Sequence, residues 1–202
     1  CNADLCFNIL NFRIKLLAIS KFDGHSIDIR VHPAMIPATR PMANVNGVLN
    51  AIRVCGNFMM ENILVGHGAG SLPTGSAVVG DVVEIARCII SGAQSRVPAQ
   101  SFQMNGMKTI PLKNINEIES GYFLHFTVLD NPGVLSSISG VLGKHSISIE
   151  SVIQRGRGRP GKGVPLVMMT HRANEKNVQD ALRVIDQMEC VSEKTVLIRV
   201  ES

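Results

Sequence analysis

The sequence has no tryptophan, and aromatic residues make up only 4% of its 202 positions. It therefore offers few of the flat side chains on which proteins stack single-stranded nucleic acid. It also has no run of about eighteen uninterrupted apolar residues, which a membrane-spanning helix needs. Residues 1–12 lack the basic flank and the long apolar run of a secretion signal. From these absences we expect a cytoplasmic protein that binds neither nucleic acid nor membranes.

The cysteines form no recognisable framework, because their number is odd and none is paired in a CxxC motif. A disulfide scaffold and a zinc site are therefore not indicated, and we expect no metal and a reducing compartment. The five are Cys1, Cys6, Cys55, Cys88 and Cys190. Since the first residue is a cysteine and not a methionine, we expect the chain to be a fragment.

What is present is the composition of a globular protein, 45% hydrophobic and 18% charged, with turn signals near the start. The β-prone runs 12–20 and 26–31 flank an Asp-Gly pair, and the run 50–65 is divided by a Gly-Asn pair. Both dipeptides favour tight turns, so two β-hairpins are predicted. An irregular loop of about ten residues is predicted where three prolines follow the first hairpin: Pro33, Pro37 and Pro41.

A glycine-rich bend at 66–70 precedes a predicted helix, in which Pro73 suits the first turn. The helix should run to about Ile90. Its apolar residues lie on more than one face, so we expect it to be largely buried. They are Val78, Val79, Val82, Val83, Ile85, Ala86 and Ile89. Residues 92–119 are polar and weakly periodic, which predicts a linker.

The last third of the chain alternates strands and helices in the order βαββαβ. Apolar alternation, helical spacing and helix caps predict these elements. Strands are expected over 123–129, 147–153, 164–170 and 195–200, and helices over 134–143 and after Asn174. The order is typical of a ferredoxin-like sandwich, in which two helices cover one face of an antiparallel sheet.

The turn from the first of these strands into its helix reads DNPGVL at 130–135, with ISI at 147–149 and SVIQ at 151–154. With these motifs, residues 122–201 resemble an ACT domain, a sensor on many enzymes of amino-acid biosynthesis. The carboxylate of a free amino acid suits the N–H groups at a helix start, and its ammonium suits a carboxylate or carbonyls. The predicted effector-binding residues are Asp130, Asn131, Gly133, Val134 and Leu135.

Three blocks upstream occur in a distinctive order. They are RIKLLAI at 13–19, VHPAMIP at 31–37 with NVNG at 44–47, and GHGAGSLPT at 66–74 leading to SAVV at 76–79. Together they resemble the last part of the homoserine dehydrogenase catalytic region. Followed by an ACT domain, the combination is similar to the members of that family that end in a regulatory domain.

The resemblance implies an α+β fold, in which part of a substrate domain with a mixed sheet and helices precedes a ferredoxin-like ACT domain. The implied limits are 1–91 for the end of the catalytic (substrate and dimerisation) domain, 92–119 for the linker and 120–202 for the ACT domain. It further implies NAD(P)-dependent interconversion of homoserine and aspartate 4-semialdehyde, in threonine and methionine biosynthesis. Feedback by threonine and a homo-oligomer are also implied.

In the family, the dinucleotide-binding domain, the proton-transfer lysine and the acidic residues that hold the substrate amine all precede residue 12. We therefore assign no catalytic residue, and we expect NAD(P) to bind through the missing amino-terminal domain and this chain alone to be inactive. The bend remains the candidate for cofactor contact, through Gly66, Gly68 and Gly70. Its spacing is not GxGxxG, and a tight turn without a ligand is the competing interpretation.

Two other functions stay open. The chain could act as a stand-alone amino-acid-binding regulatory module without catalysis. An RNA-binding ferredoxin-like domain is suggested by the order of elements and by the cluster of cations at 155–162. The first strand lacks the paired aromatics that such RNA-binding modules use, and we favour a solvated hairpin loop for this cluster.

Overall fold

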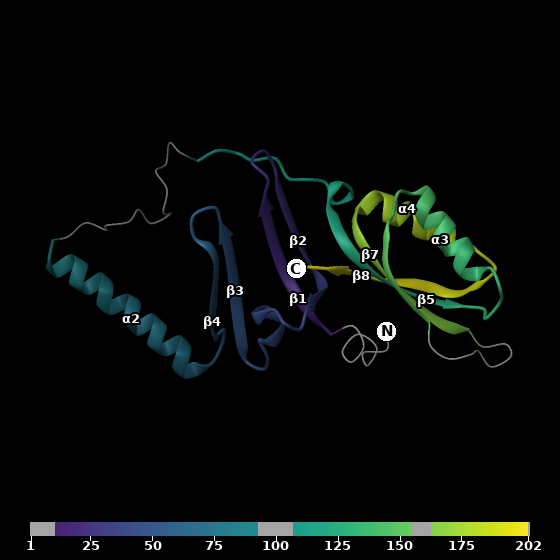
Figure 1. Ribbon diagram of the computed structural model, residues 1–202. Helices are drawn as coiled ribbons and strands as arrows, with labels where there is room; N and C mark the ends of the chain where they lie inside the picture. Colours follow the sequence, from purple (N-terminus) through teal and green to yellow (C-terminus); the bar gives the residue numbers. More distant parts are fainter. Residues whose placement is uncertain (1–10, 93–106, 155–162, 202) are drawn as a thin grey trace. The chain divides into compact units, whose positions relative to one another are not determined.

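The computed structural model describes residues 11–92, 107–154 and 163–201. The chain forms two compact units, one made of Cys1–Ala43 with Pro111–Ser202 and the other of Asn44–Ile110 (Figure 1). The second unit is thus inserted between two segments of the first. Each unit is described by itself.

The first unit is built on a six-stranded sheet with the strand order β1-β2-β8-β5-β7-β6. The strands are β1 (Phe12–Phe22), β2 (Ile27–Pro37), β5 (Glu119–Val128), β6 (Ile149–Gln154), β7 (Val164–Asn174) and β8 (Val191–Val200). Every neighbouring pair is antiparallel except β2 and β8, which run parallel and pair only at Ala34↔Arg199 and Met35↔Val200. The sheet is therefore mixed, as predicted for an α+β fold.

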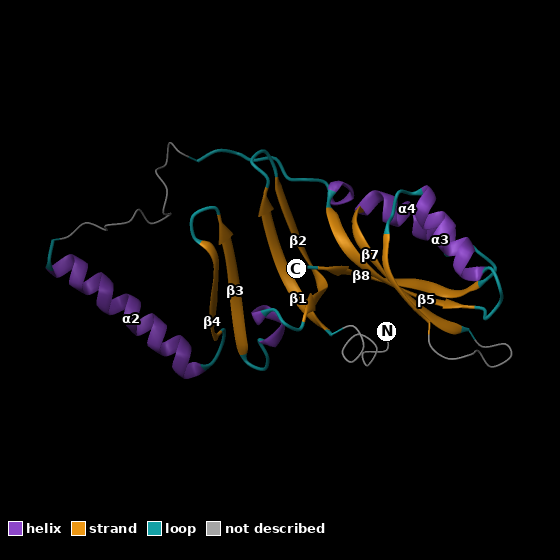
Figure 2. Ribbon diagram, in the orientation of Figure 1, coloured by secondary structure: helices purple, strands orange, loops and turns teal. Residues whose placement is uncertain are grey.

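Two helices, α3 (Val134–Lys144) and α4 (Glu175–Ile185), cover one face of this sheet (Figure 2). The short 3-10 helix η3 (Ile115–Glu117) precedes β5. The side chain of Asn174 caps α4 by accepting a hydrogen bond from the Lys176 N–H. From β5 to β8 the order is βαββαβ, which confirms the predicted ferredoxin-like sandwich.

The main hydrophobic core lies between the sheet and these helices. Alternate residues of β5 point into it, and the helices contribute apolar residues at helical spacing. Its fully buried members include Tyr122, Leu124, Phe126, Ile138, Leu142, Val178 and Ile185. A smaller cluster contains Met35 of β2 with Phe123, Val167 and Met169. Since Met35 is fully buried there, the hairpin β1–β2 packs as part of the sheet.

The prediction of an irregular loop after the first hairpin is wrong over Pro33 and Pro37. Strand β2 continues through both, with Pro33 opposite Leu16 and Pro37 opposite Phe12 of β1. Proline lacks the N–H that a central strand would donate. Strand β2 pairs with β8 at only two residues, Ala34 and Met35. Its other residues on the edge facing β8 need no N–H for hydrogen bonds between strands, so prolines are tolerated there.

The end of the predicted linker also belongs to the first unit. The Ile27 N–H donates to the Pro111 carbonyl at 3.0 Å, and the Lys113 N–H donates to the Ile27 carbonyl at 2.8 Å. The segment leading into β5 is therefore fixed to the hairpin β1–β2. The compact units thus cut across the domain limits 1–91 and 120–202, which rest on the family resemblance and stay predictions.

The second unit contains the hairpin of β3 (Leu49–Gly56) and β4 (Met60–His67), followed by α2 (Ser71–Ile90). The 3-10 helix η1 (Pro41–Asn44) lies at the boundary of the two units. None of the described residues of 44–110 is buried. Val82 and Ile89 of α2, for example, are 60% and 75% exposed.

The prediction that the helix ending near Ile90 is largely buried is therefore wrong for this chain. The helix itself is present, but the described residues of its unit supply no layer that covers its apolar faces. A helix with apolar residues on several sides needs such a layer to be buried.

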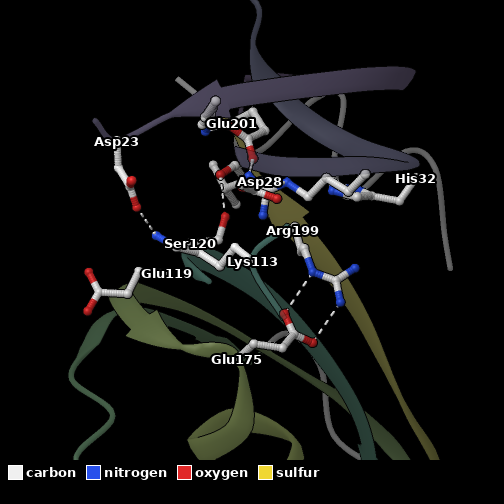
Figure 3. Close-up of polar contacts among 12 residues, drawn as sticks. Asp23, Asp28, His32, Lys113, Glu119, Ser120, Glu175, Arg199 and Glu201 are labelled. Atoms are coloured by element: carbon white, nitrogen blue, oxygen red, sulfur yellow. Dashed lines mark hydrogen bonds and ion pairs between the residues drawn. The ribbon is translucent and has the colours of Figure 1, made fainter. Parts of the chain in front are cut away.

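A buried polar network lies at the start of α4 (Figure 3). The Glu175 carboxylate is 2% exposed and accepts two hydrogen bonds from the Arg199 guanidinium, at 2.8 and 2.6 Å. The Tyr122 hydroxyl and the Gln179 amide also donate to it. Burial by itself raises the pKa of Glu175, but the hydrogen bonds from Arg199 and Gln179 outweigh it and hold this pKa below its ordinary value. The network therefore stabilises the ionised carboxylate.

We predict that Glu175→Gln lowers the free energy of unfolding of the first unit by about 3 kcal/mol at neutral pH, because Arg199 loses its charge partner. Urea unfolding followed by circular dichroism measures this. The pKa of Glu175 in the folded protein is lowered from the ordinary value of 4.5. The stability that Glu175 contributes is therefore fully present above pH 4.5 and is lost as the pH falls through the pKa of the folded protein. The difference from wild type should shrink below pH 4.5.

The exposed Glu193→Gln is the matched control, and we expect it to change the free energy of unfolding by less than about 0.5 kcal/mol. A Glu175→Gln deficit that stays constant from neutral to acidic pH would contradict the proposed charge pairing.

Candidate functional site

The loop between β5 and α3 forms one side of a cavity of about 450 Å³. All five residues predicted to bind an effector line it, together with neighbours from β5, β6 and β7. The lining residues are Val128, Leu129, Asp130, Asn131, Pro132, Gly133, Val134, Leu135, Gln154 and Leu166. The structure thus brings the motif DNPGVL into one pocket with residues distant in the sequence.

The turn at Gly133 determines how α3 faces this pocket. Gly133 caps the helix in the left-handed conformation, with φ of 91°, which L-residues with side chains rarely adopt. Its carbonyl accepts hydrogen bonds from the N–H and the hydroxyl of Ser137. No side chain caps the helix start, where the Val134 N–H donates to the Asn131 carbonyl at 3.4 Å. The first turn of a helix presents N–H groups with a positive partial charge.

The pocket combines the start of a helix, an acidic residue and apolar residues. An amino-acid carboxylate suits the N–H groups at the start of α3, because the helix dipole favours a negative charge there. Asp130 lines the same cavity, and a carboxylate is a suitable partner for an ammonium group. Val128, Val134 and Leu166 contribute apolar walls.

Five lining residues are outside the predicted set. Val128, Leu129 and Pro132 adjoin it in the sequence, whereas Gln154 and Leu166 come from β6 and β7. Gln154 ends β6 and adds a carboxamide that can donate and accept hydrogen bonds. Its position at the end of the motif SVIQ was a signal, but only the pairing of β6 with β7 brings Gln154 opposite Leu166. The basic stretch 155–162 that follows lies outside the described residues.

The glycine-rich bend lies in the second unit, between β4 and α2. The local structure gives a different reason for glycine at each of the three positions, or none. A Cβ on Gly68 would lie 1.2 Å from the Asn50 side-chain nitrogen, so this position accepts only glycine unless Asn50 moves. Gly70 has a φ of 128° and caps α2. A Cβ on Gly66 would meet nothing within 4 Å. Local geometry therefore explains Gly68 and Gly70, whereas the space beside Gly66 is open.

Across the described ranges, no group of three or more His, Cys, Asp or Glu side chains is placed to hold a metal ion. None of the helices within these ranges is long and apolar enough to cross a membrane.

Two family models match the chain, homoserine dehydrogenase over residues 7–83 and the ACT domain over residues 122–190. A homoserine dehydrogenase of Neisseria gonorrhoeae is 39% identical over 193 residues, which are 96% of this chain and 44% of that protein. One of Pseudomonas aeruginosa is 38% identical over 192 residues, 95% of this chain and 44% of that protein. The chain thus spans less than half the length of these curated relatives.

Solved structures agree with this assignment. The homoserine dehydrogenase of Thiobacillus denitrificans is 36% identical, with a TM-score of 0.84 over 96% of this chain and 43% of that one. The enzyme of S. aureus, at 21% identity and a TM-score of 0.59, shows the same fold. The chain therefore belongs to the homoserine dehydrogenase family and corresponds to the part of such an enzyme that comprises the end of the catalytic region and an ACT domain.

Proposed function

We propose that the chain is part of an enzyme that interconverts homoserine and aspartate 4-semialdehyde with NAD(P), and that threonine regulates it through the ACT pocket. The observation that carries the regulatory half is the cavity in which the whole motif DNPGVL faces a neighbouring strand. The catalytic half rests on relatives named homoserine dehydrogenase, of which the chain covers about 44%.

The catalytic groups and the dinucleotide-binding domain belong, on this proposal, to the part of the relatives that this chain does not match. The exposed apolar residues of α2 and of the hairpin β3–β4 support it, since surfaces of this kind are covered in a complete protein. Part of that cover comes from a second copy of the enzyme, so the active form is a homo-oligomer.

NAD(P) is proposed to approach the bend at Gly66, Gly68 and Gly70. The open space beside Gly66 supports this, because a backbone without a side chain lets a flat ring approach closely. When bound, NAD(P) would supply the hydride acceptor or donor, and the bend would hold it in place. The Asn50 side chain already explains Gly68, and the positive φ already explains Gly70. The proposed contact between NAD(P) and Gly66 is therefore the one to test.

A regulatory module without catalysis is the alternative function. One observation favours it: all the fully buried hydrophobic residues among the described ranges lie in the unit that contains the ACT fold. That unit has its own core and could bind an amino acid by itself.

We predict that the 202-residue chain does not oxidise homoserine, and that activity appears when the amino-terminal part of the Neisseria gonorrhoeae enzyme is fused before residue 12. Absorbance of NAD(P)H measures the reaction. Turnover by the chain alone would show that the catalytic groups lie within it. A folded fusion without activity would leave the regulatory module as the better function.

In the active fusion, Gly66→Ala is expected to raise the KM for NAD(P) about tenfold, equivalent to about 1.4 kcal/mol of lost binding, while the added methyl group meets no protein atom. Gly75→Ala in α2 is the matched control, since its Cβ also meets nothing within 4 Å, and its KM should stay at the wild-type value. Equal KM values for both variants would remove the bend from the cofactor site.

Calorimetry of the chain with the twenty amino acids should show saturable binding of threonine, lost in Gly133→Asp. The aspartate would be strained at a φ of 91° and would repel the ligand carboxylate. Gly140→Ala, on α3 with open space around it, should bind as wild type does. Asp130→Asn, which removes the charge facing the ammonium, should weaken binding about tenfold.

If Gly133→Asp fails to fold, as circular dichroism would reveal, Asp130→Asn decides the question. No binding of any amino acid to the folded wild-type chain would remove the regulatory proposal.

A further inference from the structure

The hairpin β1–β2 is attached to the ACT sheet by few backbone bonds, so side chains carry much of the attachment. Only Ala34 and Met35 of β2 pair with β8, and the Glu201 N–H adds a hydrogen bond to the Met35 carbonyl at 2.9 Å. Beyond this short parallel pairing, Glu201 also contributes its carboxylate, which lies at the end of β8 beside the hairpin (Figure 3).

Both strands of the hairpin donate to this one carboxylate. Lys21 of β1 lies 2.6 Å from one Glu201 oxygen, and Arg30 of β2 donates to the other at 2.5 Å. The side chains of Arg30 and Glu201 are 3% and 13% exposed, so solvent screens their pairing weakly. A buried guanidinium needs an anion. Arg30 also forms an ion pair with Asp28, but this contact is longer, at 3.6 Å.

The tip of the hairpin is fixed independently. Asp23 lies 2.6 Å from the Lys113 ammonium, and the Ile27 backbone exchanges hydrogen bonds with Pro111 and Lys113. That segment leads directly into β5. The hairpin is therefore connected to β5 at its tip and to β8 through Glu201.

The same two strands lead to the effector pocket at their other ends. Strand β5 ends at Val128, which lines the pocket and pairs with Val191 at the start of β8. The Leu129 N–H donates to the Cys190 carbonyl at 2.8 Å. The pocket and the hairpin thus lie at opposite ends of one pair of hydrogen-bonded strands.

We propose that Glu201 is a positioning residue that couples the occupancy of the 128–135 pocket to the hairpin 12–37, which lies within the segment matched by the homoserine dehydrogenase family model. The inference rests on the proposed effector function of that pocket. A ligand that stabilises the ends of β5 and β8 also stabilises whatever opens together with them. Glu201 makes the hairpin part of that cooperative unit because it charge-pairs both hairpin strands.

Hydrogen exchange measured by mass spectrometry on the 202-residue chain tests this, with threonine as the probe, or whichever amino acid binds in calorimetry. In the wild type, saturating ligand should slow exchange about tenfold both around the pocket and in the hairpin 12–37. In Glu201→Gln, the pocket response should remain and the hairpin response should be lost.

Glu193→Gln is the matched control, because it makes the same chemical change on β8 at a carboxylate that accepts a hydrogen bond from the Thr127 hydroxyl of β5. It should keep both responses. Lys21→Ala removes a half-exposed partner of Glu201 and should reduce the hairpin response without abolishing it. Lys21→Ala also serves as the test if Glu201→Gln does not fold.

In the active fusion, Glu201→Gln should still bind threonine, while the coupling between threonine and turnover falls from the 5- to 150-fold typical of allosteric enzymes towards about one. Ligand protection of the pocket without protection of the wild-type hairpin overturns the coupling and leaves the effector site standing. An unchanged hairpin response in folded Glu201→Gln also overturns it, and so does an unchanged response in Lys21→Ala if Glu201→Gln does not fold. If no amino acid binds to the folded chain, the effector site itself is wrong and the coupling falls with it.

Discussion

The structure of the first unit depends on burying one face of the antiparallel strands β5–β8 under α3 and α4. The residues that fill this space, such as Phe126, Leu142 and Val178, are fully or almost fully buried. Burial of apolar area is the main favourable term in folding, so this layer holds β5 and β8 in register. The effector pocket and the ion pairs of Glu201 with Lys21 and Arg30 lie at opposite ends of these two strands.

The ACT fold shares its sheet with the hairpin that precedes it in the chain. The hairpin β1–β2, which the homoserine dehydrogenase model matches, continues the ACT sheet through Ala34 and Met35. Glu175 with Arg199, and Glu201 with Arg30, form two ion pairs beside this pairing of β2 with β8, and each has one buried partner. Such pairs add little net stability compared with apolar packing, but breaking one is costly. They therefore suit a connection that must keep one particular geometry.

The second unit shows the opposite balance. Its hairpin and α2 have regular backbones, yet none of their described side chains is buried. The secondary structure of this unit is thus regular, although its apolar side chains are not packed in a core. The open space beside Gly66 and the apolar faces of α2 fit a surface that other parts of an enzyme cover, which agrees with the limited share of each relative that the chain spans.

The sequence by itself determined most of the helices and strands, the ACT-type order of elements and the residues of the pocket loop. These follow from local signals: apolar periodicity, the Asn174 cap and the glycine that allows a positive φ at position 133. Only the tertiary structure decided that β2 runs through Pro33 and Pro37, that Gln154 joins the pocket, that α2 is exposed and that Glu201 meets Lys21 and Arg30. Each of these depends on which strands become neighbours and on which surfaces are buried by other parts of the chain. Contacts between residues up to 180 positions apart leave no local pattern in a sequence.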